Sequence, residues 1–368
     1  MRPTLLLAGS LLLAPLLTGT VQAAQSIWPD QPTQFSGQLR DFRQQRCTTP
    51  PPQPYTGHLR IDSKYDQTDP TRSKLSNARP DQSVQISEQI QGYYVGLVKL
   101  AGNYHQARSA EQAREAVSCF DQWLESWARA GAIQSRDTTG TGQAMRKWAL
   151  AAISATVIKM RALTGQQFQP SSIQRSWLDR LANLVIADYQ PRLDPGFKNF
   201  NNHDYWAGWA VTSTGLVLNR DSYVIWGDQA LRRAISQIVI SPRGDYGYLP
   251  QESARGSLGA EYTHYAMVPL VLLAEAGHRN GRTLNREERE RFELLANFAA
   301  RAAMEPRNLP ELQGQQSPVS RHKMAWLMPF LNYRPGHAWA RRLYDSRFGE
   351  VDHYSQIGGT IKFFYSKL

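Results

Sequence analysis

The segment Lys198–Trp209, which reads KNFNNHDYWAGW, combines a chemical signature with the start of a predicted helix. Two amides, Asn201 and Asn202, precede the imidazole of His203, and three aromatic side chains follow closely: Tyr205, Trp206 and Trp209. Amides hydrogen-bond a carboxylate without carrying charge, imidazole exchanges a proton near neutral pH, and aromatic faces pack against sugar rings. A helix is predicted from about residue 204 to 218, so these groups lie at its beginning.

A second segment, Gln251–Tyr265, reads QESARGSLGAEYTHY and adds Arg255, Tyr262 and Tyr265. Together the two segments contain a group that neutralises a carboxylate, a proton acceptor and a proton donor. β-Elimination on a uronic-acid polymer needs all three, because the proton leaves a carbon next to a carboxylate whose growing charge must be stabilised. The residues therefore predict a site for this chemistry.

Most of the remaining chain shows helical periodicity. Ser109 is a predicted N-cap with Gln112 as its capping-box partner, and apolar residues then recur at helical spacing as far as Trp127. Further helices are predicted over residues 143–163, 172–189, 223–238, 261–276, 286–304, 323–333 and 337–346. Strand-like alternation is scarce, so the fold class is predicted to be all-α.

The N-terminal residues divide into two predicted parts. Residues 1–23 have the features of a secretory signal peptide: the charged Arg2, the apolar run Leu5–Leu17 and the sequence VQA ending at Ala23. This run is shorter than the roughly 20 residues of a membrane span, which disfavours the alternative of a membrane anchor. Residues 24–60 are predicted to form an extended arm, because TTPPPQPYTG from Thr48 cannot be helical. The mature protein is expected to be soluble and periplasmic.

The formal net charge of +11 indicates attraction to a polyanion. No DNA-binding or RNA-binding motif is visible in the sequence, so nucleic acid is not the expected partner. Export favours an acidic polysaccharide instead.

The cysteines Cys47 and Cys119 form a pair of a kind that is commonly oxidised in an exported protein. A disulfide between them would tie the arm to a helix and stabilise the fold by roughly 4 kcal/mol in the chain-entropy treatment. The alternative is that Cys119 is a buried thiol on the apolar face of its helix.

Three further words support one family resemblance: SKY at Ser63–Tyr65, WARAGA from Trp127 and MRKWAL from Met145. With the two segments above, they resemble the alginate lyase family, which degrades polymannuronate in the periplasm of alginate-making bacteria. Matching pieces run from about residue 55 to residue 267, with weaker similarity in KMAWL from Lys323 and IGG from Ile357. The resemblance covers most of the mature chain.

The resemblance implies an incomplete (α/α)6 toroid of paired helices, here a single domain over residues 61–368. Loops at one end of such a toroid would line a groove, and Arg243–Gly259 is a candidate loop. The expected enzyme is a monomer that acts on mannuronate-rich alginate. No metal or other cofactor is expected, because the histidines show neither HExxH nor Cys–His spacing and no Gly-rich phosphate loop is present.

The family's catalytic residues match Asn202, His203, Arg255 and Tyr262. The resemblance implies that Asn202 and Arg255 hold the uronate carboxylate, Arg255 through two parallel hydrogen bonds, and that Tyr262 donates a proton to the bridging O4. The C5 proton has two candidate acceptors. One is Tyr262 itself, if Arg255 and His203 lower its pKa from about 10; the other is His203.

Further positions are implied or suggested as substrate contacts. Those that match sugar-contacting family positions are Ser63, Lys64, Gly140 and Thr141. Tyr265 lies one turn after Tyr262 on the same helix face. Trp206 either stacks on a sugar ring or packs in the core, and Arg146 and Lys147 belong either to the groove or to the surface.

The sequence also departs from the family pattern. Gly140-Thr141-Gly142 stands where relatives carry HTG, Asp204 replaces a serine, Glu261 adds negative charge, and Gln356 stands in place of an arginine. These changes leave the preferred uronan open, including polyglucuronate. Two other function classes remain: an α/α-toroid glycoside hydrolase using Glu252 with Asp245 or Glu261, and a non-catalytic protein that binds acidic polysaccharide.

Overall fold

The computed structural model describes residues 23–351 and 353–366. Residues 1–22 of the predicted signal peptide therefore lie outside the described residues. Eleven α-helices occur in the described part: α1 (Asp81–His105), α2 (Ala110–Ala130), α3 (Gly140–Leu163), α4 (Ser172–Tyr189), α5 (Asn202–Leu218), α6 (Asp221–Ser236), α7 (Pro250–Ser253), α8 (Gly259–Arg279), α9 (Arg286–Met304), α10 (Leu327–Tyr333) and α11 (Ala338–Ser346).

Strands and 3-10 helices are short. The described residues contain two antiparallel pairs, β1 (Val239–Ile240) with β2 (Gly247–Tyr248) and β3 (His353–Tyr354) with β4 (Gly359–Thr360). The 3-10 helices are η1 (Ser36–Gln38), η2 (Phe42–Gln44), η3 (Gln190–Leu193), η4 (Gly256–Leu258), η5 (Pro306–Asn308), η6 (Arg321–Met324), η7 (Ser355–Ile357) and η8 (Lys362–Tyr365). The fold is all-α, as predicted.

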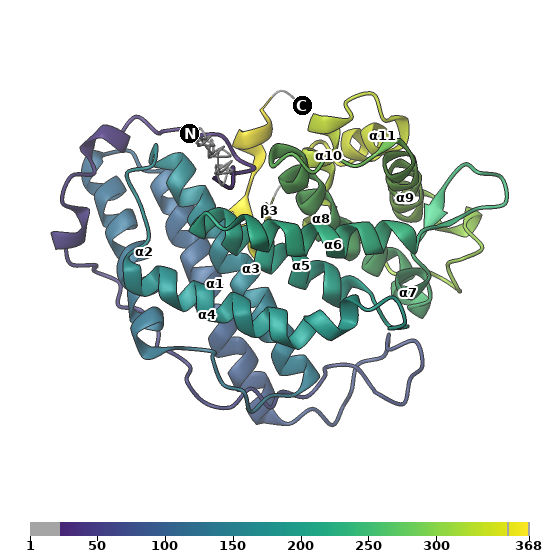
Figure 1. The fold of residues 1–368 in the computed structure, drawn as a ribbon, viewed down its shortest axis with the longest axis horizontal. Coiled ribbons are helices and arrows are strands. Elements are labelled where there is room, and N and C mark those ends of the chain that lie inside the picture. Colours follow the sequence, from purple (N-terminus) through teal and green to yellow (C-terminus); the bar gives the residue numbers. More distant parts are fainter. Residues whose placement is uncertain (1–22, 352, 367–368) are drawn as a thin grey trace, which may run out of the picture.

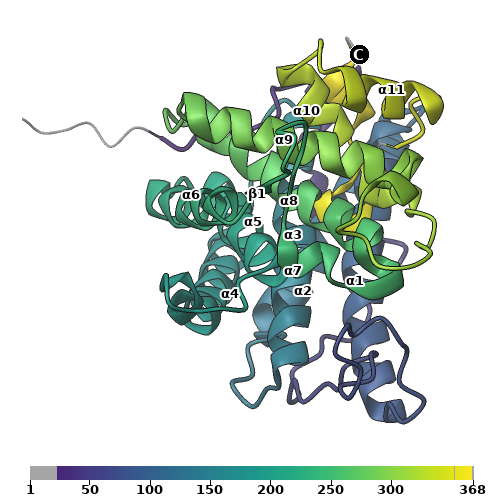
Figure 2. The same cartoon turned by 90° about the vertical axis from the view of Figure 1, so that its right-hand side faces the viewer.

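The helices pack as successive pairs around an inner set (Figures 1 and 2). Helix α3 contacts α1, α4 and α5, and α5 contacts α4, α6 and α8. Both α3 and α5 are buried on nearly every face, and the buried residues of α3 include the charged Arg146, Lys147 and Lys159. The C-terminal segment η7 packs against α3, so the last described residues are part of the core. The architecture is the predicted α/α toroid.

Local sequence signals set several helix boundaries. The Ser109 hydroxyl accepts from the backbone N–H of Gln112, as predicted, but the Gln112 side chain accepts from Arg108 N–H and not from Ser109. The full capping box predicted there is therefore wrong. Helix α4 does have one, because Ser171 and Gln174 bond each other's backbone N–H groups.

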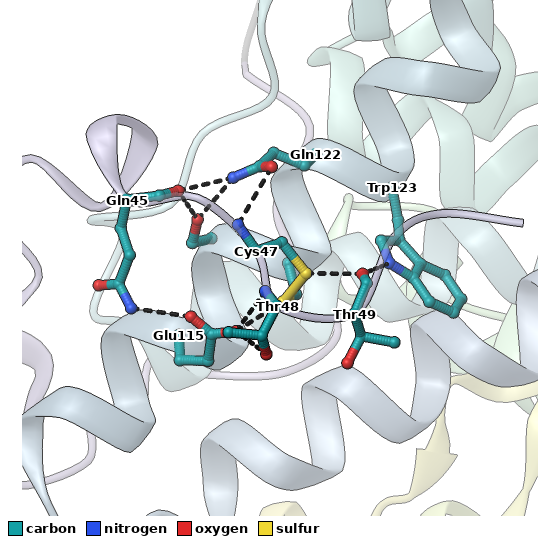
Figure 3. The surroundings of a disulfide bond; sticks show 9 residues. Gln45, Cys47, Thr48, Thr49, Glu115, Gln122 and Trp123 are labelled. Carbon is teal, nitrogen blue, oxygen red and sulfur yellow. Dashed lines mark hydrogen bonds between the residues drawn. A yellow bond between two sulfur atoms is a disulfide. The ribbon is translucent and has the colours of Figure 1, made fainter.

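The N-terminal arm packs on the toroid, and its Ile27 and Trp28 side chains are buried. A disulfide joins Cys47 of the arm to Cys119 of α2, with their Cα atoms 4.7 Å apart. Hydrogen bonds reinforce this junction (Figure 3): Gln122 accepts from Cys47 N–H at 3.3 Å, and Glu115 accepts from Thr48 N–H at 2.8 Å. The predicted pairing of the two cysteines is thus present.

Within the described residues, no helix has both the length and the apolar character needed to cross a membrane.

Candidate active site

The first turn of α5 is held by a reciprocal cap. The Asn201 side chain accepts from His203 N–H at 3.0 Å, and the Asp204 carboxylate accepts from Asn201 N–H at 2.8 Å. Arg192 of η3 donates two hydrogen bonds to the Asp204 carboxylate, from Nε to Oδ1 at 2.5 Å and from Nη2 to Oδ2 at 2.8 Å. Asp204 is therefore a buried capping residue that fixes where Asn202 and His203 lie.

Asn202 is bound to a buried carboxylate that comes 50 residues later in the chain. Its backbone N–H donates to Oε1 of Glu252 at 2.6 Å, and its Nδ2 donates to Oε2 at 2.8 Å. Burial raises the pKa of Glu252 to about 7, although the bonds from Asn202 favour the charged form. Oδ1 of Asn202 is buried and has no hydrogen-bonding partner among the described residues. Glu252 thus fixes the amide that is predicted to hold the substrate carboxylate.

His203 contacts a lysine from α3. Nζ of Lys147 lies 2.8 Å from Nδ1 of His203 and 3.0 Å from the hydroxyl of Tyr189. The Trp148 ring lies beside the imidazole, with 5.8 Å between ring centres. Burial and the neighbouring lysine hold the pKa of His203 well below its usual value, so the ring is neutral at neutral pH.

The expectation of a groove or surface position for Arg146 and Lys147 is wrong, because both side chains are buried. Arg146 binds Asp188 at 2.9 Å and donates to the carbonyl groups of Ile133 and Ser135. Lys147 belongs to the site through His203.

Arg255 and Tyr262 are in direct contact. The guanidinium carbon of Arg255 lies 3.7 Å from the centre of the Tyr262 ring. Arg255 is itself held by the loop before α1, since Nε donates to the Thr71 carbonyl at 2.9 Å and Nη2 to the Arg72 carbonyl at 2.8 Å. That loop extends below α7 in Figure 1. The two loop carbonyls accept from Nε and from one N–H of Nη2, so a carboxylate would have to bind through the remaining N–H groups of Nη1 and Nη2.

The phenol of Tyr262 is neutral in the free protein. Burial raises the pKa of Tyr262 well above its ordinary value, while the Arg255 charge acts in the opposite direction. Tyr65 lies close, with ring centres 6.3 Å apart, and Nζ of the exposed Lys64 lies 5.0 Å from the centre of the Tyr65 ring. The SKY word therefore reaches the site through Tyr65, which sequence reasoning did not single out.

Tyr265 and Trp206 form a buried layer behind Tyr262. Trp206 is fully buried, with its ring centre 5.2 Å from Tyr265 and 5.8 Å from Tyr354. In this conformation the indole presents no face to a sugar, which favours the core position over the groove. Lys323 adds a cation, since its Nζ lies 5.6 Å from the Tyr262 ring centre. The KMAWL word contained this residue, but its role was not predicted.

The remaining predicted contacts lie at the ends of elements. Gly140 and Thr141 begin α3, and Thr139 caps that helix. At Gly142 a Cβ would overlap the carbonyl oxygen of Leu59, which explains the glycine. Ser63 accepts from Tyr65 N–H at 3.1 Å. Within the described residues, no hydrogen bond or ring contact links Gly140 or Thr141 to Tyr262.

The carboxylates considered for a hydrolase already have partners. Glu252 accepts from Asn202 through both oxygens. Asp245 binds Arg301 at 2.7 Å, and Glu261 binds Lys323 at 2.7 Å. A hydrolytic general acid must instead be free to reach the glycosidic oxygen, so this arrangement disfavours a hydrolase.

Comparison with known proteins shows the family to which this chain belongs. The sequence model described as alginate lyase matches residues 60–309. An alginate lyase from Pseudomonas putida is 31% identical over 294 residues, which cover 77% of this chain and 76% of that protein. Another, from Pseudomonas aeruginosa, is 31% identical over 334 residues, or 88% of this chain and 87% of that protein.

The fold is similar to solved structures of alginate lyase A1-III. A histidine-to-alanine variant complexed with a tetrasaccharide gives a TM-score of 0.65 at 19% identity, covering 91% of this chain and 90% of that one. A tyrosine-to-phenylalanine variant, also complexed with a tetrasaccharide, gives 0.65 at 18% identity over 90% of this chain and 93% of that one. The chain therefore belongs to the alginate lyase family and is a polysaccharide lyase.

Proposed function

We propose that the protein depolymerises alginate by β-elimination at C4–C5 of mannuronate and leaves 4,5-unsaturated uronate ends. The observation that carries this proposal is the contact between Arg255 and Tyr262, at 3.7 Å from guanidinium carbon to ring centre. It places a permanent cation, suited to a carboxylate, next to a hydroxyl that can give up a proton. In a uronate the carboxylate that needs a cation is bonded to C5, and the O4 that needs a proton is bonded to the neighbouring C4.

The elimination breaks two bonds and forms one double bond. The proton on C5 passes to a base, the electron pair of that C–H bond forms the C4=C5 double bond, and the C4–O4 bond breaks with its electrons on O4. Tyr262 supplies the proton that O4 takes up, consistent with its neutral phenol. The residues that hold the carboxylate are Arg255 and Asn202, which stabilise the charge that spreads into it when C5 loses its proton.

Tyr262 and His203 differ in how readily each could accept the C5 proton. Tyr262 must first lose its own proton, which its burial opposes and Arg255 assists. His203 is already neutral, but its Nδ1 lies against Lys147, so only Nε2 remains for the substrate.

Substrate preference and location complete the proposal. A mannuronate-rich polymer is the proposed substrate, because C5–H and O4 lie on one face in mannuronate and one cluster of groups can then serve both. The net charge of +11 supports attraction to such a polyanion. We place the enzyme in the periplasm, on the basis of the signal-like residues 1–23. The proposed oligomeric state is a monomer.

The test is an ultraviolet absorbance time course with polymannuronate, polyguluronate and polyglucuronate at equal uronate concentration. The unsaturated product absorbs because its double bond is conjugated with the carboxylate. The fastest rise is expected with polymannuronate. Faster cleavage of polyguluronate or polyglucuronate would contradict the preference, and no rise with any of the three would contradict the lyase mechanism.

A further inference from the structure

Lys147 is a buried titratable group whose role the reaction described above does not include. Its side chain is fully buried, on the second turn of α3. Its Nζ meets two polar partners, Nδ1 of His203 at 2.8 Å and the Tyr189 hydroxyl at 3.0 Å. It also lies 4.6 Å from the Trp148 ring centre and 5.1 Å from that of Tyr189. The two aromatic faces stabilise a cation there.

We propose that Lys147 is a positioning residue whose ammonium donates to Nδ1 of His203 and so fixes the imidazole proton on Nε2. An ammonium group has donors and no acceptor. A neutral imidazole beside it must therefore accept through Nδ1, which leaves the N–H on the other nitrogen. This inference rests on the proposed function for its consequence, which is that His203 offers the substrate a donor.

The relative basicity of Lys147 and His203 decides which of them holds a proton that the pair shares. Burial lowers the pKa of both Lys147 and His203. An amine is intrinsically about four units more basic than imidazole, so a single proton shared by the two belongs to the lysine. The carboxylates of Asp204 and Asp188 favour the lysine cation further, and the Arg192 charge opposes it.

The charges of three arginines act on His203 in addition to that of Lys147. Arg192, Arg255 and Arg72 all act to lower the pKa of His203, together with Lys147. Among the described residues no hydrogen-bonding partner of Nε2 is present, and the ring is only half-buried. An Nε2–H group would donate to the uronate carboxylate and could not accept a proton from C5. The base would then be Tyr262, whose phenol would first release its own proton to solvent, take the C5 proton and pass it to O4.

Lys147 and its two polar partners come from three different helices. Lys147 comes from α3, Tyr189 ends α4 and His203 begins α5. The lysine therefore links three helices at the end of the toroid that carries the site. Outer partners of this kind orient an imidazole, and their removal typically reduces activity by about 10- to 100-fold, as known for metal-binding histidines.

The decisive experiment reads the tautomer directly. The full chain would be labelled with ¹⁵N-histidine, and two-bond ¹H–¹⁵N correlation spectra would be recorded without substrate between about pH 5 and 8. The spectrum of His203→Gln assigns the signals. In the wild-type protein we expect His203 to carry its proton on Nε2 and to stay neutral over this range. A proton on Nδ1 of His203 in the wild-type protein would overturn the inference.

Variants then test the part played by the lysine. In Lys147→Met the cation is lost, so the tautomers should mix, the pKa of His203 should rise, and the acid limb of the kcat/KM profile should move to higher pH. Lys147→Arg keeps a donor cation and should retain the Nε2–H form. The matched control is Lys159→Met, which removes another buried lysine from the same helix, about 18 Å along its axis. It should leave the His203 signals unchanged.

Two outcomes separate this inference from the proposed function. If His203 carries its proton on Nε2 but polymannuronate is not cleaved, the proposed function fails and the tautomer assignment stands. If the polymer is cleaved while Lys147→Met leaves the tautomer and its titration unchanged, the lyase function stands and the role of Lys147 is refuted.

Discussion

The guanidinium group of Arg255 packs on the ring of Tyr262, at 3.7 Å from carbon to ring centre. The contact joins the loop after α7 to the first turn of α8. Arg255 favours the phenolate of Tyr262, whereas burial favours the phenol. A uronate carboxylate bound to Arg255 would offset its charge and so make the phenolate oxygen of Tyr262 a stronger base. Once that oxygen holds the C5 proton, Tyr262 is the phenol that can protonate O4.

Tyr262→Phe is predicted to abolish turnover while leaving polymer binding nearly intact. The ring and its packing on Arg255 survive, and only the hydroxyl is lost, so the effect should fall on kcat. Steady-state kinetics by absorbance and calorimetric titration with mannuronate oligomers check this. The control is Tyr223→Phe, which removes a hydroxyl bound to Asp179. A Tyr262→Phe enzyme with near-normal kcat would remove this residue from the chemistry.

Arg255→Ala is predicted to weaken both binding and turnover, with kcat falling by roughly 10² to 10³, as for a lost oxyanion donor. Arg255→Lys should recover little. One ammonium cannot hold the Thr71 and Arg72 carbonyls and also present a fork to a carboxylate. Measured kcat and KM for both variants decide the point, and near-complete recovery by lysine would show that charge alone suffices.

Glu252 is predicted to make stability depend on pH. Its pKa is about 7 in the fold against an ordinary value of 4.5. The folded state binds this proton more tightly than the unfolded state, so the free energy of unfolding falls as pH rises from 4.5 to 7. The loss is about 3 kcal/mol.

Urea unfolding of the wild type and of Glu252→Gln across this range isolates the contribution. The difference in free energy of unfolding between the wild type and Glu252→Gln should change by about 3 kcal/mol between pH 4.5 and 7. Glu275→Gln is the matched control, because Glu275 is a half-buried carboxyl whose pKa is also raised to about 7. It should show the same stability trend without altering the pH–rate profile. A constant difference between wild type and Glu252→Gln would contradict the raised pKa.

The disulfide is predicted to stabilise the protein without serving catalysis. Its cysteines are 72 residues apart in sequence, which corresponds to about 4 kcal/mol in the chain-entropy treatment. It ties the arm to α2, on the side of the molecule away from α7 in Figure 1. Cys47→Ala/Cys119→Ala should therefore lower Tm and retain kcat at room temperature. Two free thiols in unreduced, denatured wild-type protein would refute the bridge.

Helix periodicity predicted most of the toroid, but α1 was not among the predicted helices. Its sequence mixes glutamines and three glycines with apolar residues, and Pro80 provides no side-chain cap. At Gly96 a Cβ would collide with the Trp123 ring of α2. The glycine is thus required by helix–helix packing, a long-range reason that a local pattern does not reveal.

In the site, too, local sequence patterns predicted some residues, and contacts made by tertiary packing were missed. Asn202, His203, Arg255 and Tyr262 were predicted from the kinds of residue in two segments and from the family resemblance. The sequence analysis assigned Lys147 to the groove or the surface and Glu252 to an alternative hydrolase. It did not predict their contacts with His203 and Asn202, because these form only through tertiary packing. A lysine beside an arginine in MRKWAL suggests an exposed face by composition. Burial of both became evident only once α4 and α5 were seen to cover them.

The central claim is elimination, and the most direct test counts products. Polymannuronate would be digested with the wild-type protein while ultraviolet absorbance reports unsaturated ends and a reducing-sugar assay reports broken bonds. Elimination should give one unsaturated end for each new reducing end throughout the reaction. New reducing ends without absorbance would establish hydrolysis and contradict the assignment of Tyr262 and Arg255 to β-elimination.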